Sequence, residues 1–178
     1  MALSYQATIT TNFATQYLAM ADNFKRMLQL VTEFFDVRND PDQLDVNEDV
    51  REKLQQLHPA TMTEVANDEG PIMWLLLIPT THDIMGRFLS EEISERQLFD
   101  ETQAGITYDA IYLCSAAVLP EFRRHGLAKK ACMDAINSIR NDHPINNLFY
   151  WPFSEDGKML AETVAKNAGL PLLLHPAH

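Results

Sequence analysis

Apolar and polar positions follow two different periods along this chain, and each period marks a class of secondary structure. From Thr11 onward, apolar side chains recur every three or four residues, at Phe13, Tyr17, Met20, Phe24, Met27, Val31 and Phe34. This spacing predicts a long amphipathic helix. The same stripe would suit the seam of a homodimer. It widens at Leu28 and Phe35, which favours packing on a sheet, and the homodimer stays an open alternative.

A second helix is predicted over 46–57, where one face is apolar at Val46, Val50, Leu54 and Leu57. Asp45 followed by Glu48 predicts its N-terminal cap, and His58-Pro59 predicts its end. We interpret His58 as a helix-end residue near the C-terminal dipole. Before the first helix, residues 1–10 alternate apolar and polar positions and predict a short strand or an ordered arm.

Shorter apolar runs predict the strands of one sheet, over 60–66, 72–78, 111–119, 147–151 and 170–174. The run 72–78 is apolar on both faces, so it belongs in the middle of the sheet. Further helices are predicted over 83–89, 90–99, 127–142 and 158–168. Ser94 with Gln97 marks the start of one of them, and Gly169 marks the end of another. This order of elements predicts an α/β (α+β) fold.

Composition narrows the class of protein. The chain of 178 residues is 46% hydrophobic, enough for one domain over 1–178. A net charge of -11 argues against general nucleic-acid binding. Cys114 and Cys132 fall in apolar segments and are interpreted as reduced thiols. With no secretory pattern and no apolar run of membrane length, we expect a cytoplasmic protein that spans no membrane.

The stretch 116–130 combines the end of a strand, a basic turn and the start of a helix, which is an arrangement that can bind an anion. An apolar strand ends at Pro120, two arginines and a histidine follow, and Gly126 opens a helical segment. A helix start presents unpaired backbone N–H groups and the positive end of the helix dipole, which together bind anions. The basic residues are Arg123, Arg124, His125, Lys129 and Lys130. The sequence therefore predicts a phosphate-binding turn here, whereas the acidic balance of the chain disfavours a nucleic-acid patch.

A family resemblance follows from the same residues. Arg123-x-x-Gly126-x-Ala128, preceded by Val118-x-Pro120, resembles the acetyl-CoA-binding motif of the Gcn5-related N-acetyltransferase (GNAT) superfamily. The resemblance implies a mixed, mostly antiparallel central sheet flanked by helices, with splayed central strands. It implies acetyl-CoA as co-substrate, no metal, and transfer of the acetyl group to an amine of a small molecule or peptide.

The resemblance also assigns roles to residues. It places the backbone of Val118 near the thioester and makes Arg123 a residue that orients the loop. The amides that would meet the pyrophosphate, and the basic residue beside them, are Arg124, His125, Gly126, Leu127, Ala128 and Lys129. Glycine suits this role because it has no Cβ to hold the phosphates away.

Two departures from the family pattern bear on whether the chain catalyses acetyl transfer and on what covers its substrate cleft. Alignment on Gly169 puts Ala165 where many members have the tyrosine that protonates the departing thiolate. An insert of about thirty residues, 79–109, separates the meander from the motif strand, and it either covers the substrate cleft or forms a surface excursion. The missing tyrosine leaves an alternative open, a catalytically inactive sensor or interaction module that binds CoA or acyl-CoA.

Candidates for the chemistry lie near the splayed strands. Tyr150, Ser154 and Tyr112 are the hydroxyl candidates, and Tyr150 is favoured near the thioester. Asp109 or Glu155 could act as the base. Cys114 as a nucleophile would need a base partner, and none is near it in sequence. The acidic residues of the insert are interpreted as a solvated face, at Glu91, Glu92, Glu95, Asp100 and Glu101.

Overall fold

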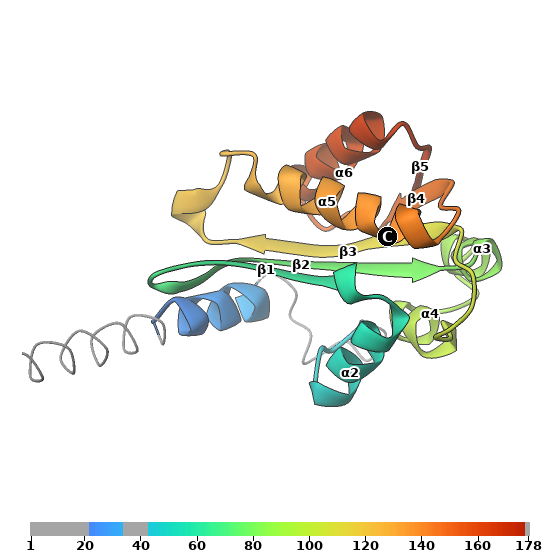
Figure 1. The fold of residues 1–178 in the computed structure, drawn as a ribbon, viewed down its shortest axis with the longest axis horizontal. Coiled ribbons are helices and arrows are strands. Elements are labelled where there is room, and N and C mark those ends of the chain that lie inside the picture. Colours follow the sequence, from blue (N-terminus) through green and yellow to red (C-terminus); the bar gives the residue numbers. More distant parts are fainter. Residues whose placement is uncertain (1–21, 34–42, 177–178) are drawn as a thin grey trace, which may run out of the picture.

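The computed structural model describes residues 22–33 and 43–176, and in these ranges a five-stranded sheet carries helices on both faces (Figure 1). The strand or arm expected over 1–10 and the start of the first helix lie outside the described residues. The mixed sheet and its flanking helices confirm the α/β (α+β) class predicted from the sequence.

The strands follow one another in sheet order as they do in sequence: β1 (Met62–Asn67), β2 (Gly70–Thr80), β3 (Ala110–Val118), β4 (Asn147–Tyr150) and β5 (Leu172–Leu174). The first three form an antiparallel meander. β4 lies parallel to β3, and β5 lies parallel to β4. The antiparallel ladders are long, whereas each parallel ladder contains three residue pairs.

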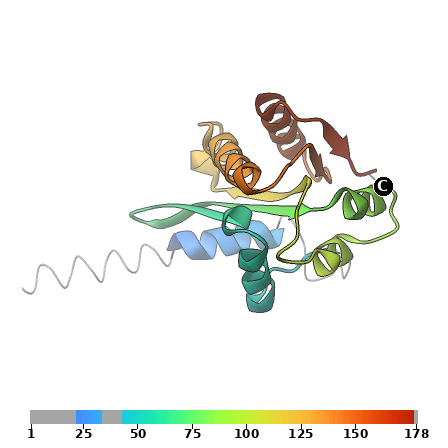
Figure 2. The same ribbon diagram turned by 45° about the vertical axis from the view of Figure 1, so that its right-hand side comes forward.

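Helices cover both faces of this sheet (Figures 1 and 2). α5 (Leu127–Asp142) and α6 (Glu155–Ala168) lie together on one face. The helical segment 22–33, α2 (Glu48–Leu57) and α4 (Glu95–Glu101) lie on the opposite face, and α3 (His82–Leu89) lies at one end of the sheet. Among the helices that the structure describes, none is both long enough and apolar enough to cross a bilayer.

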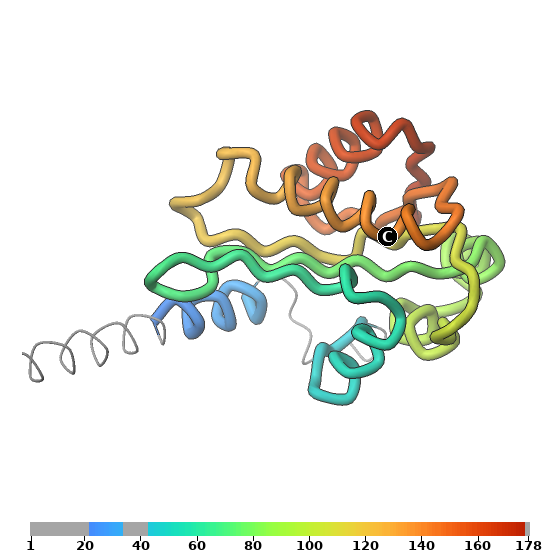
Figure 3. The backbone as a smooth tube through the Cα atoms, in the orientation of Figure 1, coloured from blue at the N-terminus to red at the C-terminus, as the bar shows by residue number. Residues whose placement is uncertain are grey.

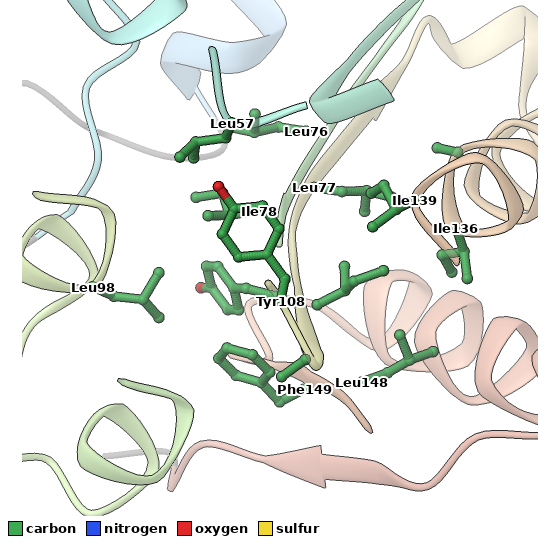
Figure 4. Packing of buried hydrophobic residues seen from close by; sticks show 14 of the residues in the cluster. Leu57, Leu76, Leu77, Ile78, Leu98, Tyr108, Ile136, Ile139, Leu148 and Phe149 are labelled. Atoms are coloured by element: carbon green, nitrogen blue, oxygen red, sulfur yellow. The ribbon is translucent and has the colours of Figure 1, made fainter. Parts of the chain in front are cut away.

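β2 supplies the centre of the core, as its two apolar faces predict. Alternate side chains of a strand point to opposite faces. Leu77 accordingly lies near Ile136 and Ile139 of α5, while Ile78 lies on the other face, towards Leu98 of α4 (Figure 4). Burial on both faces stabilises the fold by the hydrophobic effect, about 25 cal/mol for each Å² of apolar surface removed from water.

Several elements begin a few residues away from the predicted boundary, because the capping residues differ or because a short turn comes first. Asn47, and not Asp45, caps α2, since its side chain accepts a hydrogen bond from the Val50 amide. β1 starts at Met62, because residues 59–61 form a 3-10 turn. α6 starts at Glu155, because Ser154 accepts from the Gly157 amide at 3.1 Å.

The described part of the first helix confirms packing on the sheet. Met27 is fully buried, and with Leu30 it contacts Ala117 and Leu119 at the end of the motif strand. Leu30 is not in the predicted stripe, and Phe24 of that stripe is 46% exposed beside Trp74. The buried face is therefore turned slightly from the one that the spacing predicted, and the homodimer seam remains an untested alternative.

The insert 79–109 is not a surface excursion. Its two helices and the turn between them bring apolar side chains into the main core, namely Ile84, Met85, Phe88, Ile93, Leu98 and Phe99. The predicted helix over 90–99 starts later, at Glu95, behind a capping box of Ser94 and Gln97 that confirms the predicted cap. The interpretation of its acidic residues as a solvated face is wrong for Glu95, which is 5% exposed.

Candidate functional site in the gap between two strands

β3 and β4 part soon after they meet. Their ladder ends at the pair Tyr112 and Phe149, while β3 continues to Val118 and β4 ends at Tyr150 (Figure 3). Over 113–118, β3 has β2 as its neighbour on one side and no described strand on the other. The two strands therefore part beyond this pair.

A cleft of about 730 Å³ occupies this gap. Its lining includes Ala116 and Val118 on the side of β3, Ala128 and Cys132 from α5, and Val164 from α6. Leu30 and Phe122 also line it, and these residues pack with the cluster on the opposite face of the sheet. The cleft therefore has walls from both faces, as a passage between two parted strands requires.

The backbone of β3 points into this cleft at alternate residues. Leu119 donates its amide to the Ile72 carbonyl at 3.0 Å, so its backbone faces β2. Backbone groups in an antiparallel ladder alternate between facing the partner strand and facing away from it. The amide and carbonyl of Ala116 and the amide of Val118 consequently face the cleft, where they can pair with a ligand that carries amide groups.

The loop from Pro120 to Gly126 brings amides to one end of the cleft. Arg124 has φ 64° and Gly126 has φ 76°, so two residues of this short turn adopt the left-handed conformation. Such turns direct successive N–H groups to one side and form anion-binding concavities. α5 then starts at Leu127, with Gly126 as its N-cap and no side-chain cap on its first amides. The loop and the helix dipole favour an anion at the same point.

Seven of the eight residues predicted to bind the cofactor line the cleft: Val118, Arg123, Arg124, Gly126, Leu127, Ala128 and Lys129. His125 is exposed and lies outside this lining. The Arg123 side chain donates from Nε to the Val118 carbonyl at 2.9 Å, which ties the loop to the end of β3. This contact agrees with the orienting role expected for Arg123, and it leaves the Val118 amide as the group that faces the cleft.

The three hydroxyl candidates differ in position. Tyr150 and Ser154 line the cleft, although the Ser154 oxygen also caps α6. Burial, and after it the charge of Glu162, raises the pKa of Tyr150 above its ordinary value, so its hydroxyl stays protonated at neutral pH. Tyr112 is fully buried outside the cleft lining, and its hydroxyl donates to Glu95 at 2.8 Å.

Glu95 is a functional candidate that the sequence analysis missed. One carboxylate oxygen accepts from the Tyr112 hydroxyl and from the Cys114 thiol at 3.5 Å, and the other accepts from the Leu44 amide at 2.7 Å. A signal was present in the sequence, because Leu98 and Phe99 follow Glu95 by three and four residues and share its face of the helix. That face packs in the core, so it carries Glu95 inward.

Cys114 connects this carboxylate to the cleft. The register between β2 and β3 shifts at Leu76 and Leu77, which leaves Cys114 as the extra residue of a β-bulge. Cys114 is among the residues that line the cleft, and its thiol contacts Glu95. Burial, and next the charge of Glu95, raise the pKa of the Cys114 thiol well above its ordinary value. A thiol in this state is a weak nucleophile, which agrees with the non-catalytic interpretation of Cys114.

Aromatic rings line the cleft next to β4, and sequence reasoning also missed them. Trp151 and Phe153 both line it, with ring centroids 4.9 Å apart. Trp151 also packs on His175, which in turn packs on Phe88 of the insert. No spacing along the chain predicts this cluster, because its members come from three separate segments.

The bases named from the sequence have other positions. Asp109 accepts from the His82 amide at 2.6 Å at the start of α3, and neither it nor Glu155 lines the cleft. No residue of the insert 79–109 lines the cleft, so the insert does not cover it, and it contacts lining residues through Glu95 on Cys114 and Phe88 on Trp151. Ala165 is buried in the core between α6 and the sheet, while its neighbour Val164 lines the cleft.

Within 22–33 and 43–176, no cluster of His, Cys, Asp and Glu side chains has the arrangement of a metal site. No family model, no curated protein and no solved structure matches the chain.

Proposed function

We propose that this protein is an acetyl-CoA-dependent N-acetyltransferase of the GNAT type, which acts on an amine of a small molecule or peptide. The observation that carries the proposal is the cleft between β3 and β4, which has a basic, amide-rich turn at one end. A CoA ester combines a pyrophosphate with a long arm that contains two amides. The turn at Gly126 suits the first part, and the backbone of Ala116 and Val118 suits the second.

The chain supplies a role for each part of the reaction. The amides before α5 and the side chains of Arg124 and Lys129 bind the phosphates, and the backbone of Val118 and Ala116 pairs with the amides of the arm, which brings the thioester towards Cys114 and Tyr150. The neutral amine attacks the thioester carbon, its nitrogen loses a proton to solvent water, and the carbon–sulfur bond breaks as the CoA thiolate leaves. Tyr150 protonates that thiolate, because it lines the cleft and a tyrosine hydroxyl carries its proton at neutral pH.

A binding module without turnover is the second candidate, and Ala165 favours it. The methyl group of Ala165 is buried and offers no proton to a leaving thiolate. In that case the cleft would hold CoA or acyl-CoA as a signal or as part of a complex. The two candidates differ in turnover and agree on binding.

Calorimetric titration with acetyl-CoA, followed by measurement of thiol release with a panel of amines, tests both candidates. We expect one site per chain with affinity in the micromolar range, about -8 kcal/mol. Tyr150→Phe should retain acetyl-CoA binding and lower thiol release by about a hundredfold, as loss of a general acid does. Absence of binding at millimolar acetyl-CoA would contradict both candidates, and binding without thiol release from any amine would support the sensor.

A matched pair of lysine and arginine variants locates the phosphate end. Arg124 lines the cleft, whereas Lys130 lies outside its lining and pairs with Asp134 at 2.6 Å. Arg124→Ala should weaken acetyl-CoA binding by about three- to tenfold at low salt, and less at high salt, because exposed charges are screened. Lys130→Ala should leave the affinity unchanged. Equal losses in the two variants would mean that general positive charge, and not this site, attracts the ligand.

A further inference from the structure

The end of the cleft beside Trp151 has the opposite character from the end beside Gly126. Arg124 and Lys129 make the turn end basic. At the bulge of β3, the carboxylate of Glu95 lies behind the lining residue Cys114 and accepts from its thiol at 3.5 Å. Basic side chains at one point of a cleft and a carboxylate behind its wall at another orient a ligand pair, with the anionic partner at the first point and the cationic partner at the second.

The wall beside the bulge is apolar and aromatic. β3 and β4 run parallel and are in register at Tyr112 and Phe149, so Trp151 lies across the gap from the bulge at Cys114. Phe153 is 43% exposed and packs on Trp151 at a ring angle of 42°.

The Trp151 ring is held in place before any ligand arrives. His175 lies 4.8 Å from it between ring centroids, and Phe88 lies 6.3 Å from it at an interplanar angle of 70°. His175 is itself 5% exposed, and its amide donates to the Tyr150 carbonyl. A ring that is fixed by its neighbours binds a second ring without a large loss of side-chain entropy, which makes it an effective anchor.

We propose that the acceptor is a primary amine carried by a short chain on an aromatic group. Its ring lies against Trp151 and Phe153, and its nitrogen lies at the bulge, near Cys114 and Glu95. Aromatic contact binds the body of the acceptor. The carboxylate and the faces of the rings both attract the ammonium group. This inference rests on the proposed function, because it names the substrate class for the same cleft.

A comparison of three amines tests the inference: 2-phenylethylamine, hexylamine and spermidine. Thiol release from acetyl-CoA should give a KM for 2-phenylethylamine about tenfold below that for hexylamine, with spermidine the poorest. Phe153→Leu and Trp151→Leu should remove this preference and leave the KM for acetyl-CoA unchanged. Phe24→Leu is the control, since Phe24 is a similarly exposed ring away from the cleft. Hexylamine or spermidine as the best acceptor, or an equal rise in KM for all three amines, would overturn the inference.

Binding measurements separate this inference from the proposed function. The same three amines are titrated calorimetrically into the chain with and without CoA, so the order of affinities is obtained even if no acetyl group is transferred. Glu95→Gln should weaken 2-phenylethylamine several-fold and leave the uncharged analogue 2-phenylethanol unchanged. Weaker binding of both ligands, or of neither, would contradict the role of the carboxylate. If acetyl-CoA itself does not bind, the proposed function fails, and the order of amine affinities still decides the aromatic site.

Discussion

The two ends of the cleft differ in how far apart in the sequence their parts lie. The turn end is built by one continuous stretch, from Val118 to Lys129, in which strand, loop and helix start follow one another. The bulge end is assembled from Glu95, Cys114 and Trp151, which come from three separate segments. A backbone-based anion site can be encoded locally, because it needs only a turn and a helix start. A side-chain site depends on tertiary packing.

The largest effect that would sharpen this comparison is the loss of stability in Glu95→Ala. The Tyr112 hydroxyl and the Leu44 amide would both lose their acceptor while buried. Each buried donor left unsatisfied costs about 1–3 kcal/mol, so the free energy of unfolding should fall by about 3 kcal/mol. Urea denaturation measures this change. Glu92→Ala, at an exposed residue of the same insert, should change it by less than about 0.5 kcal/mol. A similar loss of stability in both variants would mean that the hydrogen bonds of Glu95 make no special contribution to the fold.

The next effect concerns the turn end and uses two glycines with nearly the same φ. Gly126 has φ 76° and Gly105 has φ 78°, and neither would place a new Cβ within 4 Å of another group. Alanine at either position should cost about 1 kcal/mol of stability, since the left-handed conformation disfavours a side chain. Only Gly126→Ala should also weaken the binding of acetyl-CoA, by about tenfold or 1.4 kcal/mol in calorimetry.

The two variants together decide what Gly126 does. If Gly105→Ala weakens acetyl-CoA equally, the effect arises from lost stability and the turn has no special part in binding. If Gly126→Ala destabilises the chain and leaves the affinity intact, the phosphates lie elsewhere.

The smallest effect tests the charge at the bulge end through two thiols in one molecule. Burial and Glu95 raise the pKa of Cys114, whereas burial alone raises the pKa of Cys132 to about 12. Removing the negative charge in Glu95→Gln lowers the pKa of Cys114, so more thiolate is present at pH 8 to 9. Alkylation of Cys114 by iodoacetamide, followed by mass spectrometry, should accelerate several-fold. Cys132 should react at an unchanged slow rate. An equal acceleration at both residues would indicate general opening of the fold.

These two ends also mark how much the sequence could predict. The order of strands and helices follows from local patterns, and the structure has it. The parting of β3 from β4 has no local signal in the chain and is expected only from the family resemblance. The capping residue of α2 was misassigned because Asp45 and Asn47 are both good caps, and only the helix geometry selects Asn47.

Glu95 and Trp151 could not be placed from the sequence for a different reason. A glutamate among five acidic residues is normally solvated, and its burial here depends on donors supplied by Tyr112 and Cys114 from another element. Trp151 follows the last residue of a short strand, and its position in the cleft depends on where β4 ends relative to β3. Both facts belong to tertiary structure and leave no periodic trace in the chain.

The short ladder between β3 and β4 has a consequence for how the molecule holds together. Only three residue pairs join the meander to the parallel strands, and beyond them the backbone of β3 faces the gap with groups that a neighbouring strand would normally satisfy. A ligand arm with amides that lies in the gap takes the place of that strand. Its hydrogen bonds then contribute to cohesion between the two parts of the sheet, so ligand binding and conformational stability are thermodynamically linked.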